Sequence, residues 1–502
     1  MNLLITMGIF FAIWLVASWI IALSVSIIVG AINLRSQSGK LYEARILASL
    51  PQNVKSPVIP DKGLLGHIGR LYAGENGCIY NAVEKMVHEY GPVIQLDIVG
   101  NKWLVISDQR MIQHILTDRR QQFPKTGDIV DEIKAMFGDK MLIVTEGSEW
   151  LRQRQLCMPA FRLDRLKEMM VEMNSVARIA VDGLVPDETF DAHELANRIG
   201  FAVICQVGFD YRVAVYGNKS PMFESEEYCC EQLLIRVQRT KFWKKLPLPS
   251  NFKLKEMLLV QRQLLQEVID NRAPQAENAR ILLDLFKTAA SEEGQTLCDE
   301  ELIQLVQNFV IAGFETTATL IMWTLYYLAE NPQYQNRVRE EIKTVVGHKQ
   351  DIEYDDYKQL AFLEKVINET LRLRPGFPFI IRACAEDTEL CSWHIPKGSA
   401  VNLNLRAVHM NPEIWGDDVD RFNPHRFDED KIAARPLHHF LPFGMGPRVC
   451  IGHRFTMMEA MIVIGQFVRQ YHFELEPGQN LKPFLKLVWG VKAGMKMRAV
   501  PT

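Results

Sequence analysis

The stretch Phe443-Gly444-Met445-Gly446-Pro447-Arg448-Val449-Cys450-Ile451-Gly452 places one cysteine in a loop that is punctuated by three glycines. Glycine lets a backbone approach a ligand closely and turn its amides toward the cysteine sulfur. An arginine precedes the cysteine by two residues, and the apolar residues that follow favour a helix. A free cysteine is usually a small buried hydrophobe, but these neighbours predict that Cys450 binds a ligand through its sulfur.

A cysteine thiolate is suited to be the fifth ligand of a haem iron, because soft anionic sulfur donates electron density that favours O–O bond cleavage. Arg448 can meet a haem propionate as a charge-assisted hydrogen-bond donor. The helix expected after the loop would point its positive end at Cys450. We therefore expect the pKa of this thiol to be lowered.

Five residues of the loop, Phe443, Gly446, Arg448, Cys450 and Gly452, fit the pattern F-x-x-G-x-R-x-C-x-G. This pattern resembles that of the cytochrome P-450 family, in which the cysteine binds the haem iron. The resemblance implies that Cys450 is the metal ligand and that Phe443, Arg448 and Gly452 help to bind the cofactor.

The composition is that of an ordinary globular protein, with 502 residues of which 48% are hydrophobic and 23% are charged. Lys and Arg number 57 against 60 acidic residues, so the net charge of −3 does not favour a nucleic-acid partner. The nine cysteines form no C-x-x-C pair, which argues against a disulfide scaffold or a structural zinc site.

The N-terminal residues 1–34 carry no charged side chain, and Leu3 to Ile32 is almost continuously apolar. This length exceeds the roughly 20 residues that cross a bilayer, and the basic start and short apolar centre of a cleaved signal peptide are missing. Three basic residues, Arg35, Lys40 and Arg45, follow it. The positive-inside rule then predicts a single-pass anchor in the endoplasmic reticulum membrane, with the catalytic domain in the cytoplasm.

A linker over residues 35–62 is first basic and then interrupted by prolines. Residues 63–502 show mainly helical periodicity, broken by short β-like pieces at Val93 to Ile98 and Trp103 to Ser107. With no internal repeat or composition shift after residue 62, the sequence predicts one large catalytic domain, mainly α with small β-sheets.

A long helix is predicted from Glu301 to Glu330, and Ala312-Gly313-Phe314-Glu315-Thr316-Thr317 interrupts its apolar stripe. The motif resembles the family's A/G-G-x-D/E-T-T signature. If Ala312 and Gly313 let the helix pass close over a haem, Thr316 would lie beside dioxygen while Glu315 relays protons from water. Alternatively, Thr316 only bonds the carbonyl of the preceding turn.

Glu369 and Arg372 stand three residues apart, on one side of a predicted helix. They match the family's E-x-x-R motif, which an arginine from a P-x-R-F segment joins in a buried network. Here that segment is Pro424-His425-Arg426-Phe427, with His425 where the family usually has an acid. The resemblance implies a structural role for Glu369, Arg372 and Arg426.

Trp150 and Arg154 match the family's W-x-x-x-R, whose side chains reach the haem propionates. Both are hydrogen-bond donors, as two carboxylates require. Arg382 stands where the family often places another propionate arginine. Five positions fall where the resemblance puts the walls of an apolar substrate pocket, although each could equally be a core residue: Phe314, Phe379, Ile380, Val488 and Trp489.

Taken together, these motifs imply a triangular helical fold with a b-type haem. The implied reaction inserts one oxygen atom from O2 into an apolar organic substrate. Since the chain has no nucleotide-binding signature, electrons from NADPH are expected through a separate reductase. Two alternatives are a haem-thiolate isomerase or dehydratase without external electrons, and a non-enzymatic haem-binding protein. Glu315 and Thr316 favour the monooxygenase, because a proton relay has no use in the alternatives.

Overall fold

The computed structural model describes residues 59, 66–72, 79–98, 101–238, 241–270, 281–292, 294, 297–390, 393–485, 488–491 and 493–502. The predicted membrane anchor, and all of the predicted linker except residue 59, lie outside these residues. Residues 63–502, predicted as one domain, form two compact units. Unit 1 runs to Met111 and includes Ala383–Asn402, and unit 2 comprises Ile112–Arg382 and Leu403–Thr502.

Unit 1 contains two antiparallel hairpins and two helices. One hairpin pairs β1 with β2 in a register that places Val93 opposite Ile106, and the other pairs β5 with β6. His67 ties this unit together, because its Nδ1 accepts from the Asp97 N–H at 2.8 Å and its Nε2 lies 3.0 Å from the Ile59 carbonyl oxygen. The elements are α2 (Ile68–Tyr72), α3 (Ile79–Tyr90), β1 (Val93–Ile98), β2 (Asn101–Ile106), β5 (Thr388–Leu390) and β6 (Trp393–Ile395).

Three elements span the points where the chain passes between the units: α4 (Gln109–Leu116), β4 (Phe379–Ala383) and β7 (Ala400–Asn404). Unit 2 holds most of the helices. They are α5 (Asp128–Phe137), α6 (Gly147–Cys157), η2 (Met158–Phe161), α7 (Leu163–Asp182), α8 (Ala192–Phe209), α9 (Pro221–Gln238), α10 (Lys241–Lys245), α11 (Pro249–Asp270), α12 (Leu282–Glu292), α13 (Asp299–Glu330), α14 (Pro332–Val345), α15 (Tyr354–Tyr357), α16 (Ala361–Leu373), α17 (Leu405–His409), α18 (Pro412–Trp415), η3 (Pro424–Phe427), α19 (Glu429–Ala433), η4 (Gly446–Arg448) and α20 (His453–Gln470).

The sheets of unit 2 are small and antiparallel. One has the strand order β3-β11-β8, and the other pairs β9 with β10. Their strands are β3 (Thr189–Asp191), β8 (Tyr471–Leu475), β9 (Pro483–Leu485), β10 (Trp489–Val491) and β11 (Lys496–Pro501). The predicted fold class, mainly helical with small sheets, is thereby confirmed.

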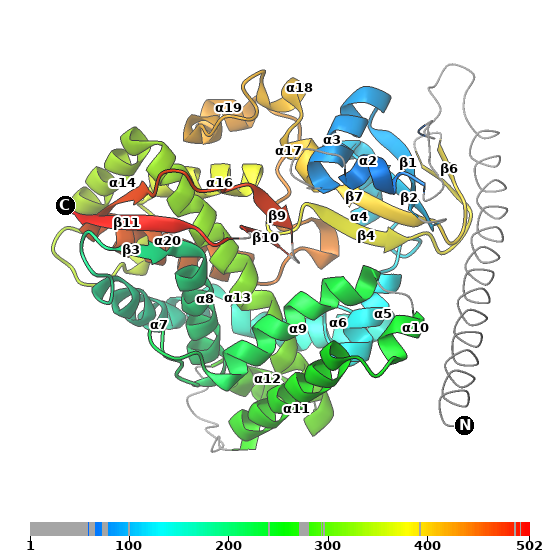
Figure 1. Ribbon diagram of the computed structural model, residues 1–502, viewed down its shortest axis with the longest axis horizontal. Helices are drawn as coiled ribbons and strands as arrows, with labels where there is room; N and C mark the ends of the chain where they lie inside the picture. The colour runs from blue at the N-terminus through cyan, green and yellow to red at the C-terminus, as the bar shows by residue number, and fades with distance from the viewer. Residues whose placement is uncertain are drawn as a thin grey trace, which may run out of the picture. The chain divides into compact units, whose positions relative to one another are not determined.

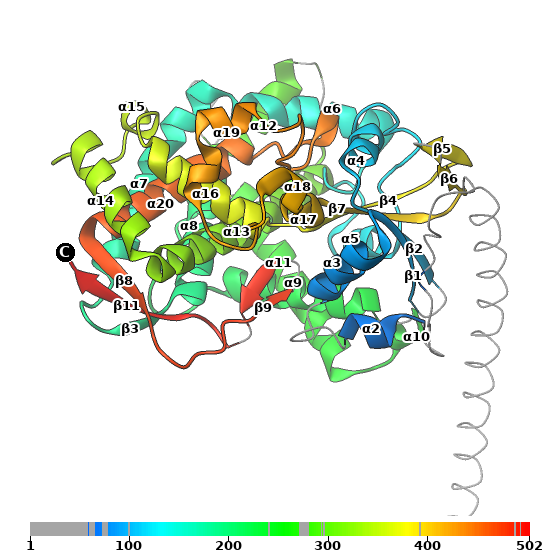
Figure 2. The same cartoon turned by 90° about the horizontal axis from the view of Figure 1, so that it is seen from above.

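The helix α13 is the core element of unit 2 and packs on α8, α16, α20 and β8 (Figures 1 and 2). Its first turn carries Asp299, Glu300 and Glu301, which suit the positive end of a helix, and it ends before Asn331. Among the described residues it is the one helix with the length and apolar content of a membrane span. Because 72% of its most apolar window is buried, α13 is a core helix.

Two glycines allow α8 and α13 to cross with their backbones in contact. A Cβ added at Gly200 would lie 2.7 Å from the carbonyl oxygen of Phe314, and one added at Gly313 would lie 2.8 Å from Cγ1 of Ile204. We expected Gly313 to let α13 pass close over a haem. The structure shows that its missing side chain makes room for the crossing with α8, and the approach to a haem stays a prediction.

The crossing predicts different outcomes for two glycines of the same helix. Gly200→Ala should lower the free energy of unfolding by about 1–3 kcal/mol, because the new methyl group overlaps a backbone carbonyl. In the matched variant Gly208→Ala, the methyl group meets its nearest atom at 3.6 Å, so stability should be unchanged or slightly higher. Thermal and denaturant unfolding measure both, and equal effects would contradict the crossing.

Candidate functional site

The cysteine loop has a geometry that depends on glycine. Gly444 and Gly446 both have φ of +71°, a left-handed conformation that other residues rarely adopt. A Cβ at Gly446 would lie 2.3 Å from the carbonyl oxygen of Leu116. The Cys450 N–H donates to the Phe443 carbonyl oxygen at 3.0 Å, which closes the loop directly before α20. The Cys450 side chain is thereby left exposed.

The electrostatic surroundings of Cys450 differ from our expectation. Loss of hydration among the surrounding protein atoms raises the pKa of this thiol. The Gly452 N–H, Arg154 and Lys125 lower it, but by less. The expected lowering by the helix end was therefore wrong in direction for the protein alone, although binding to a metal ion deprotonates a thiol outright.

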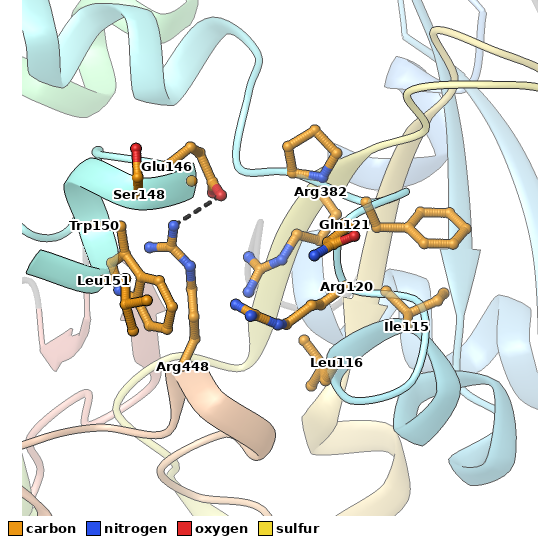
Figure 3. Close-up of a pocket in the computed structure, with 13 residues that line it drawn as sticks. Ile115, Leu116, Arg120, Gln121, Glu146, Ser148, Trp150, Leu151, Arg382 and Arg448 are labelled. Atoms are coloured by element: carbon orange, nitrogen blue, oxygen red, sulfur yellow. Dashed lines mark ion pairs between the residues drawn. The ribbon is translucent and has the colours of Figure 1, made fainter.

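A cavity of about 490 Å³ lies beside the loop and is lined by three arginines, Arg120, Arg382 and Arg448. Their side chains converge on the cavity in Figure 3. Arg448 donates to the Thr145 carbonyl oxygen at 2.6 Å and forms an ion pair with Glu146 at 2.8 Å. Its guanidinium lies 4.4 Å from the ring centre of Trp150.

Positive charge accumulates around this cavity. Burial and then Arg448 lower the pKa of Arg382 to about 10. Burial, Arg382 and Arg448 lower the pKa of Lys125 to about 7. Glu146 is the one carboxylate among the described residues that line the cavity. A donor set of this kind fits a cofactor that brings two carboxylates, as haem does with its propionates.

The predicted propionate donors occupy this region, and others were missed. Trp150 is buried on α6, and Arg154 lies 5.9 Å from its ring centre and acts electrostatically on Cys450. Sequence reasoning missed Arg120 and Lys125, because they stand in a segment without a recognisable motif. Their position depends on contacts such as that of the Lys125 N–H with Glu146 at 2.8 Å.

The polar motif of α13 is linked to the cysteine loop through residues 376–380. Thr316 lies near the segment before β4, because a Cβ at Gly376 would be 3.9 Å from its Cβ. The strand that follows, β4, reaches the cysteine loop, where a Cβ at Gly444 would lie 3.3 Å from Cδ1 of Ile380. The Thr316 hydroxyl donates to the Ala312 carbonyl oxygen at 2.8 Å, as in the alternative we considered.

The predicted pocket walls divide into two groups. Phe379 and Ile380 are half-buried. Phe314 is 2% exposed and packs edge-on against Phe201. Val488 and Trp489 are 3% and 1% exposed, and the Trp489 carbonyl oxygen accepts from Trp323 Nε1 at 3.2 Å. Phe314, Val488 and Trp489 therefore pack in the interior of unit 2, and their place in a pocket wall stays a prediction.

The structural triad comes together as a buried ion network. Arg372 donates to both oxygens of Glu369, at 2.7 and 2.8 Å, and both side chains are fully buried. Arg426 Nε lies 3.4 Å from Glu369 Oε1, a distance that gives an ion pair but no aligned hydrogen bond. His425 faces away from the triad toward Asp428 at 3.1 Å, so the missing acid at its position leaves the network intact.

Removal of the shared carboxylate should disrupt the haem region. Glu369→Ala leaves the buried Arg372 without its anion and Arg426 with Asp418 alone, at a cost of roughly 3–5 kcal/mol. We expect loss of haem incorporation, measured as the haem-to-protein absorbance ratio. Glu364→Ala removes an exposed carboxylate from the same helix and should load haem normally. A haem-loaded Glu369→Ala protein would contradict the structural role.

Lys125 should make haem binding depend on pH. With a pKa of about 7 in the haem-free protein, its ammonium group is charged below pH 7 and neutral above it. Attraction of a propionate therefore weakens as pH rises through 7, by at most about tenfold per pH unit. Titration of apoprotein with haem should show this step in wild type and in Lys134→Met, an exposed lysine, but not in Lys125→Met. The same pH dependence in all three would exclude the role.

Comparisons with known proteins agree with this site. The family model for cytochrome P450 matches residues 58–496. A cytokinin hydroxylase of Arabidopsis thaliana is 30% identical over 72% of this chain and 72% of its own length. Cytochrome P450 4F5 of Rattus norvegicus is 29% identical over 80% of this chain and 81% of its own length.

A third relative, the bifunctional cytochrome P450/NADPH–P450 reductase of Bacillus cereus, is 27% identical over 89% of this chain and 42% of its own length. The family model thus covers well over half of the chain, and it includes the cysteine loop, the cationic cavity and the polar motif of α13. The chain belongs to the cytochrome P450 family and is an oxidoreductase of the monooxygenase type.

Proposed function

We propose that this protein inserts one oxygen atom from O2 into an apolar organic substrate, with electrons from a separate NADPH-dependent reductase. The observation that carries the proposal is that unit 2 contains an exposed Cys450, a cationic cavity beside its loop and the Glu315-Thr316 motif of α13. Neither an isomerase nor a plain haem-binding protein needs the acid and the hydroxyl.

The residues around the cavity would bind haem b. Cys450 would ligate the iron, with Phe443 and Gly452 shaping the loop around it. The propionates would be held by four donors, which are Trp150, Arg154, Arg382 and Arg448. When bound, the haem supplies the iron that activates dioxygen.

Thr316 and Glu315 would hold and deliver protons on the side of the haem that faces away from Cys450. The Thr316 proton is committed to the Ala312 carbonyl oxygen, which fixes the hydroxyl group and leaves its lone pairs free to accept. Thr316 would therefore position a proton-bearing water or substrate oxygen. Glu315 would replace the proton that is consumed, as general acid catalysis requires.

Phe379 and Ile380 are the predicted pocket residues that stay half-buried, so we propose that they contact the substrate. Aromatic and aliphatic side chains favour an apolar molecule or an apolar part of one. The relatives that carry a substrate in their names are too distant from this chain to transfer it.

The proposal of a separate reductase is supported by relatives such as cytochrome P450 4F5, of whose length this chain covers 81%, against 42% of the bifunctional protein of Bacillus cereus. Basic residues near the cysteine loop would be natural contacts for the reductase, but several are already paired. Arg152 binds Glu149 at 2.8 Å and also contacts Glu301, and Arg165 binds Glu168 at 3.2 Å. The docking surface would therefore rely on shape as well as on charge.

We propose a location at the endoplasmic reticulum membrane, with the catalytic domain in the cytoplasm. Support comes from the uncharged stretch at residues 1–34 and the basic residues that follow it.

Two measurements test this function. The reduced protein with carbon monoxide should give the difference spectrum of a thiolate-bound haem, and Cys450→Ala should abolish it. A thiol-free spectrum in wild type would overturn the haem-thiolate assignment. Product formation should also require NADPH and a reductase, since turnover without them would favour the isomerase.

Thr316→Ala should uncouple oxygen consumption from product formation and release peroxide. The structure offers a matched control, because Thr324 lies on the same helix and donates in the same way to the Leu320 carbonyl oxygen at 2.7 Å, but is fully buried. Thr324→Ala should stay coupled. If Thr316→Ala turns over with full coupling, its role in proton handling is excluded.

A further inference from the structure

A second acid lies in the protein interior behind the polar motif of α13. Glu226 on α9 is fully buried, and its Oε1 accepts a hydrogen bond from Gln307 Nε2 at 2.6 Å. Its other oxygen, Oε2, is buried and makes no well-aligned hydrogen bond among the described residues, although Gln261 lies near enough to lower the pKa of Glu226. Burial raises the pKa of Glu226 to about 8. Near neutral pH this side chain is therefore mostly a neutral acid that carries a proton.

No positive charge stands among the groups that face Glu226. They are Gln307 and Glu315 from α13, Gln261 from α11, Cys205 from α8, and Cys229 from its own helix. Burial raises the pKa of Cys205 and Cys229, so both thiols are neutral. Glu315 is the one group of this set that can add a negative charge, and it raises the pKa of Glu226 further.

The periodicity of α13 explains why the two acids influence each other. Gln307, Ile311 and Glu315 are spaced by four residues, so they follow one ridge of the helix. Side chains in a helix lean toward its N-terminus. The Glu315 carboxyl group therefore leans toward Gln307, to which Glu226 is bonded.

A purely structural role does not explain a glutamate at this position. Glutamine has the same shape and would accept the same hydrogen bond from Gln307, without the cost of a buried ionisable group. A buried carboxyl group beside an acid of the proposed proton relay indicates instead that its proton is used.

We propose that Glu226 and Glu315 form a coupled acid pair, in which Glu226 stores a proton and returns it to Glu315 after Glu315 has released its own. In this step the O–H bond of Glu226 breaks and an O–H bond forms on the Glu315 carboxylate. Glu226 is left as an anion and regains a proton from bulk water. Glu226 thus supports the reaction through Glu315, and the proposal rests on the proposed function of that residue.

Infrared spectroscopy of the resting protein tests the stored proton without turnover. Burial also raises the pKa of Glu459, so the signal of Glu226 is read from the difference between wild type and Glu226→Gln. This difference should show the carbonyl band of a protonated carboxylic acid at pH 7 that disappears as pH rises through about 8, whereas the exposed control Glu224→Gln should give no such difference. Glu315→Gln should move the loss of the band to lower pH, because a negative neighbour is removed.

Turnover assays test whether the reaction uses the proton of Glu226. Glu226→Gln should lower the product formed per NADPH by up to about tenfold, less than the roughly 10²–10⁴ that a direct general acid contributes. It should also enlarge the solvent isotope effect and alter the pH profile near 8. Glu226→Asp, which retains an acid, should restore part of the coupling, and Glu224→Gln should match wild type.

The acid pair and the proton relay can be disproved separately. If no infrared band depends on Glu226, or if Glu226→Gln keeps wild-type coupling and pH profile, the acid pair is overturned while the monooxygenase function stands. Full coupling in Glu315→Gln overturns the proton relay itself, whatever Glu226 does.

Discussion

The contact between α8 and α13 at Gly200 and Gly313 is the constraint on which the site geometry depends. At this crossing the backbone of one helix touches the other, so neither helix can slide or rotate without a clash. The residues directly after it are Glu315 and Thr316. Their position is therefore set by a core contact, which holds the proposed proton relay as rigidly as the core itself.

Charge is distributed unevenly around this fixed helix. On the side of the cysteine loop, Arg120, Arg382 and Arg448 converge and leave more positive charge than Glu146 can balance. On the side of α9, two acids face buried neutral groups. The first region is suited to bind an anionic cofactor, and the second is suited to keep protons bound at neutral pH, because a low dielectric disfavours carboxylate ions.

Local motifs in the sequence predicted the loop, the buried Glu369-Arg372 pair and the helical fold, because each depends on residues that are close in sequence. The missed residues, Lys125 and Glu226, have no such signature. Their chemistry arises from burial and from partners far away in the chain. The direction of the Cys450 pKa was missed for the same reason, since desolvation by the whole fold outweighs the nearby helix end.

Phe314 belongs to the polar motif of α13 by sequence, but its side chain packs in the protein interior. It stands between Gly313 and Glu315, yet a step of one residue turns a helix by about 100°, and its ring packs edge-on with Phe201 and Phe223. The motif therefore has two faces, one that packs on α8 and α9 and one that meets the site. Replacing Phe314 would act on the core first and on the reaction only through the position of α13.

The groups that surround the cysteine loop are mutually unfavourable until a ligand of the right charge is present. Desolvation by the surrounding protein raises the pKa of the Cys450 thiol and lowers those of Lys125 and Arg382, so each group is driven toward its neutral form. A cofactor with a cationic metal and two carboxylates, as proposed above, would reverse all three tendencies. The metal would stabilise the thiolate, and the carboxylates would stabilise the protonated lysine and arginine. Part of the binding free energy of such a cofactor would therefore come from removing the unfavourable desolvation and charge repulsion that these groups have in the protein alone.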